Sequence, residues 1–284
     1  MRDDFTLSEE ERQVRDLARG LARAHIAPRA AVVDEAELYP AESLAHVAQA
    51  GLMGLYVPER YGGAGLGALA PEMPDGFLRY FYLDWDKRQT EFKPGITLDL
   101  QPFPGTLAVG IDPKDPSPRK GGATDPLAPV STLRPWKNGS NMDINELQEG
   151  SSIFIPVFLK GALIWTGDSH CRQGNGEVNL TALECANREI VIQPIVHKGM
   201  KTEWPRLETK THWVLTGFDE DLNKAMVIAV REAVDFLAAQ KAVPLTRYEA
   251  YSLVSMVGDC RVSQVVDVRK GVHCMVPKSV FAKR

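Results

Sequence analysis

The sequence predicts an α+β fold, in which a short helical segment (residues 1–66) precedes a β-rich domain (residues 67–284). Three observations predict this fold. Apolar residues recur at helical spacing over the first 50 residues, and from about Met73 they fall in short alternating runs between Gly and Pro turns. After Thr216 long helical stripes return, so helices and strands are mixed in the second part.

Composition excludes several classes of function. With 284 residues and 44% hydrophobic content, the chain can bury one large core or two ordinary ones. The net charge of −4 offers no basic surface, so neither nucleic acid nor an anionic membrane is expected as a partner. No apolar run resembles a signal core or a membrane span. The four cysteines lack CxxC spacing, which fits a reducing compartment and predicts a cytoplasmic protein.

The helical segment has clear start and stop signals. Overlapping capping boxes begin at Thr6 and Ser8, and apolar residues then follow helical spacing as far as Pro28. A second helix is predicted over residues 40–51, with Pro at its first turn and Gly at its end. Residues 57–65 are rich in glycine and predict a loop or linker.

In the β-rich domain, residues 152–160 predict a strand that is apolar on both faces and therefore buried on both sides, despite Pro156. Residues 112–135 predict a long loop, either a lid over a site or a disordered insert. Residues 222–237 predict a core helix capped by Asp219. A capping box at Thr246 starts another helix, which ends near Val257, and residues 261–268 return to strand.

The stretch from Gly167 to Glu177 concentrates chemically active side chains between residues 152–166 and 178–184, which both read as extended. Asp168 and His170 stand two apart, so on a strand they point to the same side and could share one divalent metal ion. An imidazole with carboxylates suits Zn²⁺ or a similar ion. Glu177 lies across a glycine turn, as a third ligand or a general base.

Two further acids could join this site. Glu184 ends an apolar row, where a carboxylate is costly unless it is paired or binds an ion. Its strand parity is opposite to that of Glu177, so both face one site only if a bulge or a strand end intervenes. Asp143 follows a glycine turn and could approach from another segment.

A purely structural interpretation stays open. Asp168 could accept backbone hydrogen bonds in a turn, His170 could be a buried core histidine, and Asp143 could be a cap. A nucleophilic role for Cys171 is disfavoured, because adjacent residues on a strand point apart and His170 could not take its proton. Cys171 fits a small buried hydrophobic residue better. His212 and His273 are weaker candidates for lining a pocket.

Residues 73–281 contain a set of short motifs, at 102–106, 141–143, 156–157, 161–163, 167–168 with His170, 173–177, 216–219, 235–237, 250–251 and 270–273. Taken jointly, these motifs resemble those of the acetamidase/formamidase family. The resemblance implies hydrolysis of short amides such as formamide and acetamide to ammonia and a carboxylate, on a β-rich fold usually assembled into homo-oligomers. It strengthens the metal interpretation: an ion held by Asp168, His170 and Asp143 would activate water, and Glu177 would carry the proton to the leaving amine.

The chain departs from that family in two places. Asn175 stands where the commoner motif has Asp, which removes one negative charge near the expected ion. Residues 5–66 instead resemble the first helices of acyl-CoA dehydrogenases, and they replace the β-rich region with which the amidase family begins. No flavin site is carried over from that resemblance. The chain therefore resembles a fusion of two gene fragments, and a catalytically inactive oligomerising remnant is the alternative to an active amidase.

Overall fold

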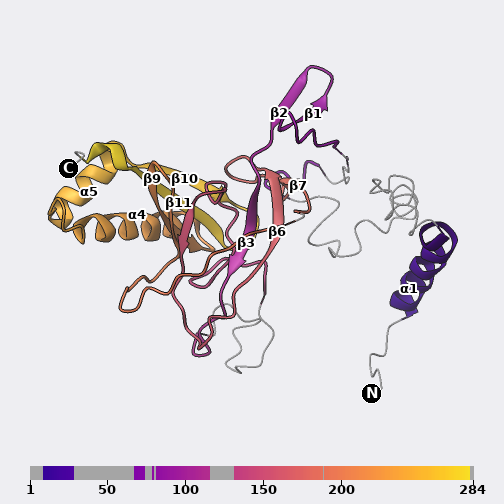
Figure 1. The fold of residues 1–284 in the computed structure, drawn as a ribbon, viewed down its shortest axis with the longest axis horizontal. Helices are drawn as coiled ribbons and strands as arrows, with labels where there is room; N and C mark the ends of the chain where they lie inside the picture. Colours follow the sequence, from indigo (N-terminus) through magenta and orange to yellow (C-terminus); the bar gives the residue numbers. More distant parts are fainter. Residues whose placement is uncertain are drawn as a thin grey trace. The chain divides into compact units, whose positions relative to one another are not determined.

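The computed structural model describes residues 9–28, 67–73, 79, 81–115, 131–187 and 189–281 (Figure 1). The chain divides into two units, each considered by itself: Met1–Gly65 with Asp75–Phe77, and Leu66–Pro74 with Leu78–Arg284. Across the described residues, no helix is long and apolar enough to cross a membrane.

In the first unit, helix α1 (Glu9–Leu21) continues into a π-helical turn (Ala22–Ile26). This confirms the helix predicted before Pro28. The predicted helix over residues 40–51 and the glycine-rich loop over residues 57–65 lie outside the described residues.

Antiparallel sheets dominate the second unit, as the α+β prediction requires. A five-stranded sheet has the order β10-β11-β9-β8-β5, and a four-stranded sheet has the order β4-β3-β6-β7. Strands β1 (Gln89–Lys93) and β2 (Ile96–Asp99) form a separate hairpin. The strands of the larger sheet are β5 (Ser152–Phe154), β8 (Arg206–Glu208), β9 (His212–Asp219), β10 (Asp259–Gln264) and β11 (Lys270–Pro277). Those of the smaller sheet are β3 (Phe103–Ala108), β4 (Gly139–Asn141), β6 (Trp165–Arg172) and β7 (Leu183–Glu184).

Helices α4 (Leu222–Ala238) and α5 (Arg247–Val257) lie beside the five-stranded sheet (Figure 1). A short 3-10 helix (Lys278–Val280) follows β11 in the sequence. The predicted apolar stripe of α4 is buried, through Ala225, Ala229, Ala233, Val234 and Leu237. Its cap is Asp221 and not Asp219, because the Asp221 carboxylate accepts from the first free backbone N–H groups. The capping box at Thr246 is confirmed, with both reciprocal hydrogen bonds to Glu249.

Strands β9 and β11 of the five-stranded sheet are buried on both faces, and successive side chains of each strand point into different cores. On β9, Leu215 packs into a core shared with α4 and α5. Val214 and Phe218, on the opposite face of β9, join a second core together with Leu107 of β3 and Met142. The second core connects the two sheets, and Asn141 at the end of β4 donates a hydrogen bond to Asp267 between β10 and β11.

Three strand predictions need correction. Residues 152–160 are not a doubly buried strand: β5 ends at Phe154 before Pro156, forms the edge of its sheet, and leaves Val157 59% exposed. Residues 178–184 contribute only the two-residue strand β7. Residues 261–268 are strand only as far as Gln264, after which the chain turns toward β11. The predicted loop over residues 112–135 lies largely outside the described residues.

The cysteines are paired, contrary to the prediction from their spacing. Cys171 on β6 forms a disulfide with Cys185, just after β7. Cys260 on β10 forms a disulfide with Cys274, which lies opposite it on β11. Cys171 is buried as expected, but as half of a disulfide. The spacing of cysteines therefore no longer argues for a reducing compartment.

Candidate functional site

His170 lies near the end of β6, an interior strand of the four-stranded sheet, and is 1% exposed. It lies opposite Phe103 of β3 on one side and Glu184 of β7 on the other. The Phe103 ring meets the imidazole edge-on, with 5.2 Å between ring centroids. The ring is thus held in a fixed orientation by its two neighbouring strands.

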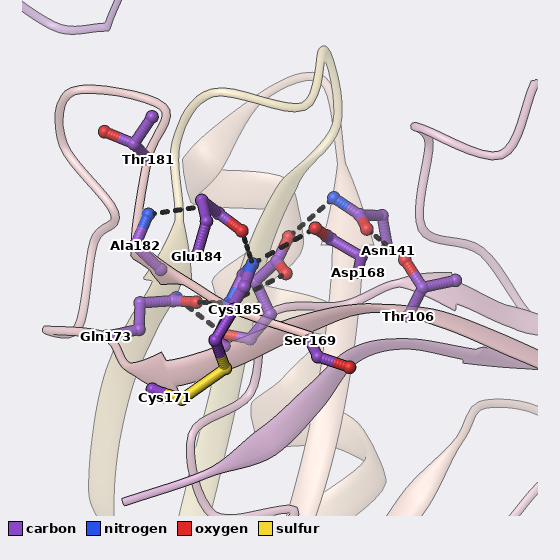
Figure 2. A network of polar contacts seen from close by, with 12 residues as sticks. Thr106, Asn141, Asp168, Ser169, Cys171, Gln173, Thr181, Ala182, Glu184 and Cys185 are labelled. Atoms are coloured by element: carbon purple, nitrogen blue, oxygen red, sulfur yellow. Dashed lines mark hydrogen bonds and ion pairs between the residues drawn. A yellow bond between two sulfur atoms is a disulfide. The ribbon is translucent and has the colours of Figure 1, made fainter. Parts of the chain in front are cut away.

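Two carboxylates converge on one nitrogen of this imidazole. His170 Nε2 lies 3.3 Å from Asp168 Oδ1 and 3.3 Å from Glu184 Oε2. Figure 2 shows Asp168 and Glu184 pointing toward the centre of the polar network from different sides. The side chains of Asp168 and Glu184 are 37% and 49% exposed, so this edge of the cluster opens to solvent although His170 is buried.

The other imidazole nitrogen is held by Gln173. The Gln173 Nε2 group donates to the backbone carbonyls of Asp143, at 3.0 Å, and Ser263, at 3.2 Å. Its Oε1 atom must therefore face His170 Nδ1, 2.7 Å away, and accept the Nδ1 hydrogen. Gln173 consequently directs the lone pair of a neutral His170 to Nε2, between the two carboxylates.

Three more carboxylates lie behind the imidazole. Asp143, Glu177 and Asp267 are 0%, 7% and 2% exposed. Asn141 Nδ2 donates to Asp143 Oδ2 at 2.8 Å and to Asp267 Oδ2 at 3.1 Å, which fixes these two acids relative to each other. The cluster therefore has an open edge and a fully buried interior.

The backbone at the site is unusual. Asp143, Asp168 and Glu177 have φ angles of 49°, 53° and 42°, in the left-handed region that favours glycine. Such conformations cost free energy and concentrate at functional sites. At Asp168 the left-handed turn interrupts the simple alternation of the strand, and at Glu177 it turns the chain after β6.

Gly105 of β3 leaves the space that this cluster needs. A Cβ atom at position 105 would lie 2.5 Å from Asp143 Oδ1, 2.9 Å from the Asp168 carbonyl and 2.9 Å from His170 Cε1. Any larger residue at this position would push into three members of the cluster at once. The requirement for glycine here is one of space, because no left-handed φ is involved.

The pKa values of the cluster are shifted because several carboxylates lie close together around one buried imidazole. Burial lowers the pKa of His170, but hydrogen bonds and charge pairing with Asp168 and Glu184 outweigh it and raise the pKa to about 10. Burial, followed by repulsion from Asp267, raises the pKa of Glu177 to about 8. Burial and the neighbouring Asp267 raise the pKa of Asp143 well above its ordinary value, and burial raises that of Asp267 to about 6.

The donor set fits a divalent cation. Three groups of side chains bring one ligand atom each to within 4.8 Å of the others: Asp143/Asp168/His170, His170/Glu177/Glu184 and Asp143/Glu177/Asp267. Within the described part of the chain, Asp143 Oδ1 and Glu177 Oε2 are buried and have no hydrogen-bond partner. Unsatisfied buried carboxylate oxygens are costly, and a bound cation would satisfy them.

The structure brings together all five residues proposed from the sequence: Asp143, Asp168, His170, Glu177 and Glu184. The condition for Glu177 and Glu184 to face one site is met, because Glu177 lies in a left-handed turn after the end of β6 and the β6–β7 register shifts between His170 and Arg172. Asp267 was missed, since it arrives from the β10–β11 turn and no local pattern marks it. Gln173 was noted as part of the motif, but its role in orienting His170 depends on carbonyls far away in the sequence.

A disulfide borders the site. Cys171 follows His170 and Cys185 follows Glu184, so the disulfide between them fastens the two-residue strand β7 to β6 (Figure 2). A cavity of about 390 Å³ lies elsewhere, lined by residues that include Trp136, Asp219 and Lys224 and by no member of the cluster.

The raised pKa of Glu177 predicts a specific pH dependence of stability for the metal-free protein. The ordinary glutamate pKa of 4.5 applies to the unfolded chain, so between about pH 4.5 and 8 the folded state binds more protons than the unfolded state. Stability should therefore fall as pH rises through this window, by at most about 1.4 kcal/mol per pH unit from this group. Glu177→Gln should flatten the curve. Urea unfolding with chelator at pH 5 to 8 measures it, and parallel curves for the two proteins would contradict the assignment.

Comparison with protein-family models gives two matches. The model described as "Acetamidase/Formamidase family" matches residues 84–283, which include every residue of the cluster. The model "Acyl-CoA dehydrogenase, N-terminal domain" matches residues 8–71. Both resemblances stated from the sequence are thus confirmed.

Individual relatives agree with this division. An acetamidase of Mycolicibacterium smegmatis is 40% identical over 72 residues, which are 25% of this chain and only 18% of that protein. A probable acyl-CoA dehydrogenase of Mycobacterium leprae is 43% identical over 68 residues, which are 24% of this chain and 18% of that protein. The crystal structure of an acetamidase from Bacillus halodurans aligns with a TM-score of 0.64 and 27% identity, over 77% of this chain and 68% of that one.

Proposed function

Because the chain belongs to the acetamidase/formamidase family, we propose that it hydrolyses the carbon–nitrogen bond of short aliphatic amides such as formamide and acetamide, with the help of a divalent metal ion. The observation that carries the proposal is the buried imidazole of His170, whose Nε2 lies 3.3 Å from two partly exposed carboxylates. The proposed substrate is a small amide that reaches this open edge from solvent.

His170, Asp168, Glu184 and Asp143 are the side chains that would hold the ion. This mixture of imidazole and carboxylates suits Zn²⁺, which we propose as the ion. When bound, such an ion acts as a Lewis acid that activates water and polarises a carbonyl group. Gln173 would make Nε2 the nitrogen of His170 that is free to bind an ion, because its own oxygen accepts the Nδ1 hydrogen.

Glu177 is the proposed general base. Its carboxylate is buried and lies in one group with His170 and Glu184, beside the proposed ion, where a general base must stand. Glu177 takes a proton from the attacking water while the water oxygen bonds to the amide carbon. It then passes the proton to the nitrogen as the carbon–nitrogen bond breaks, so that ammonia leaves and the carboxylic acid that remains loses its proton to solvent.

The test couples two measurements on the purified full chain. Metal content is measured by mass spectrometry, and ammonia release from formamide and acetamide is measured before and after treatment with chelator. We expect turnover that disappears with chelation and returns when Zn²⁺ is added. A chain that binds metal without turnover, or that turns over without metal, would contradict the metal-assisted mechanism. A chain that does neither supports the inactive-remnant alternative.

The same proposal includes assembly into a homo-oligomer, as the family resemblance implies. Light scattering coupled to size-exclusion chromatography measures the mass of the particle, and a mass of 31.4 kDa would contradict assembly.

A further inference from the structure

Three carboxylates from three separate loops meet in the interior beside His170. Asp143 follows β4, Glu177 follows β6, and Asp267 lies in the turn between β10 and β11. Each contributes one oxygen to a group within 4.8 Å. We propose that Asp143, Glu177 and Asp267 form a second cation site, distinct from the one at His170 Nε2, and that it takes a hard divalent cation such as Mn²⁺, Mg²⁺ or Ca²⁺.

Unsatisfied buried oxygens point to a ligand at this position. Asp143 is fully buried and Glu177 is 7% exposed, yet Asp143 Oδ1 and Glu177 Oε2 have no hydrogen-bond partner among the residues described. The other Asp143 oxygen is already bound by Asn141, which also holds Asp267. The network thus orients both aspartates and leaves Asp143 Oδ1 without a hydrogen bond, 3.8 Å from His170 Nδ1.

The donors decide which cation fits. This group contains no imidazole or thiolate, and sites made only of carboxylate oxygens favour hard cations over Zn²⁺. Asp143 and Glu177 also belong to the groups that contain His170. Carboxylates shared between neighbouring groups are a suitable arrangement for two ions side by side, as in hydrolytic centres that stabilise attacking and leaving groups together.

Shared protons are the competing explanation. Asp143 and Asp267 lie close enough to share a hydrogen, and one or two protons could satisfy three buried acids without any cation. The two explanations differ in stoichiometry: the second site requires two bound ions per chain, whereas shared protons leave one.

The inference rests on the proposed metal-dependent function, because Asp143 would bind both ions and Glu177 would bind the second ion through one oxygen while the other oxygen takes the proton. Each part can nevertheless fail separately. The full chain is stripped with chelator and dialysed against Zn²⁺ and Mn²⁺, and bound metal is counted by mass spectrometry. Bound Mn²⁺ is followed by electron paramagnetic resonance. Asp267→Asn tests the new site alone, and Glu184→Gln is the matched control, because it changes one acid of the His170 site and none of the new site.

We expect two ions per wild-type chain. Asp267→Asn should keep the Zn²⁺ and lose at least about tenfold in Mn²⁺ affinity, whereas Glu184→Gln should weaken Zn²⁺ binding and keep the Mn²⁺. One ion per wild-type chain, or equal Mn²⁺ affinity in Asp267→Asn and wild type, would overturn the second site and leave the proposed function standing. If circular dichroism shows that Asp267→Asn does not fold, the wild-type stoichiometry decides alone.

Discussion

Replacing His170 with alanine is expected to abolish ammonia release from formamide while the chain remains folded. The imidazole is the only nitrogen donor in the candidate metal groups of the described residues, and it takes part in two of the three groups. Loss of a residue that only orients a ligand commonly lowers metal affinity 10- to 100-fold, so loss of the ligand itself should exceed about 100-fold.

The stability of this variant is part of the prediction. Removing the ring leaves a space next to Phe103, and the acids around it lose their positively charged partner. Those acids can compensate by binding protons, because burial already raises the pKa of Asp143 and Glu177. We therefore expect a lower melting temperature at high pH and a folded protein at pH 6, as seen by circular dichroism.

His212→Ala provides the matched control. His212 begins β9, and its ring contacts the neighbouring Thr211 hydroxyl, away from the cluster. Its activity and metal content should equal those of wild type. Turnover by His170→Ala at the wild-type rate, with wild-type metal content, would remove His170 from the site.

The second large effect is on folding. Gly217→Ala should lower the free energy of unfolding by about 3 kcal/mol, the upper part of the usual range for overpacking a core. A Cβ atom at position 217 of β9 would lie 2.3 Å from the Ala225 carbonyl and 2.5 Å from the Ala229 backbone nitrogen. Both atoms belong to the main chain of α4, so a change of side-chain rotamer cannot relieve the contact.

The expected decrease in melting temperature is roughly 6 to 12 °C for a domain of this size. Gly167→Ala is the control, because Gly167 also lies within a strand, β6, but has open space where its Cβ would lie. Its stability should change by less than about 0.5 kcal/mol. Equal melting temperatures for the two variants would show that α4 does not pack on β9 as closely as described.

Local patterns in the sequence were sufficient to predict the helices of the second unit. The apolar stripe of α4 and the capping box of α5 depend only on neighbouring residues, and both are confirmed. Strand lengths were predicted less well. Pro156 ends β5 early, and only two residues after the glycine turn pair as β7, since strand pairing depends on partners far away in the sequence.

In the candidate site, too, local features were predictable from the sequence and long-range contacts were not. Asp168 and His170 do lie together, but the left-handed φ of Asp168 interrupts the strand alternation from which their proximity was predicted. Nothing in the sequence indicated that Asp267 belongs to the cluster. Asp267 follows the end of β10, which lies beside the turn after β6 because Gly176 pairs with Gln264, and this pairing joins segments far apart in the sequence. The cysteines were misjudged for a related reason: a separation of 14 residues says nothing about which strands lie side by side.

The left-handed backbone conformations of Asp143, Asp168 and Glu177 lower the stability of the fold at residues that the proposed function requires. At each position glycine would adopt the same φ with less strain, and the strain of a side chain there is of the order of 1 kcal/mol. Together the three positions account for about 3 kcal/mol, a large share of the 5–15 kcal/mol that holds a typical domain folded. The most thermostable version of this chain and the version that carries these acids are therefore different molecules.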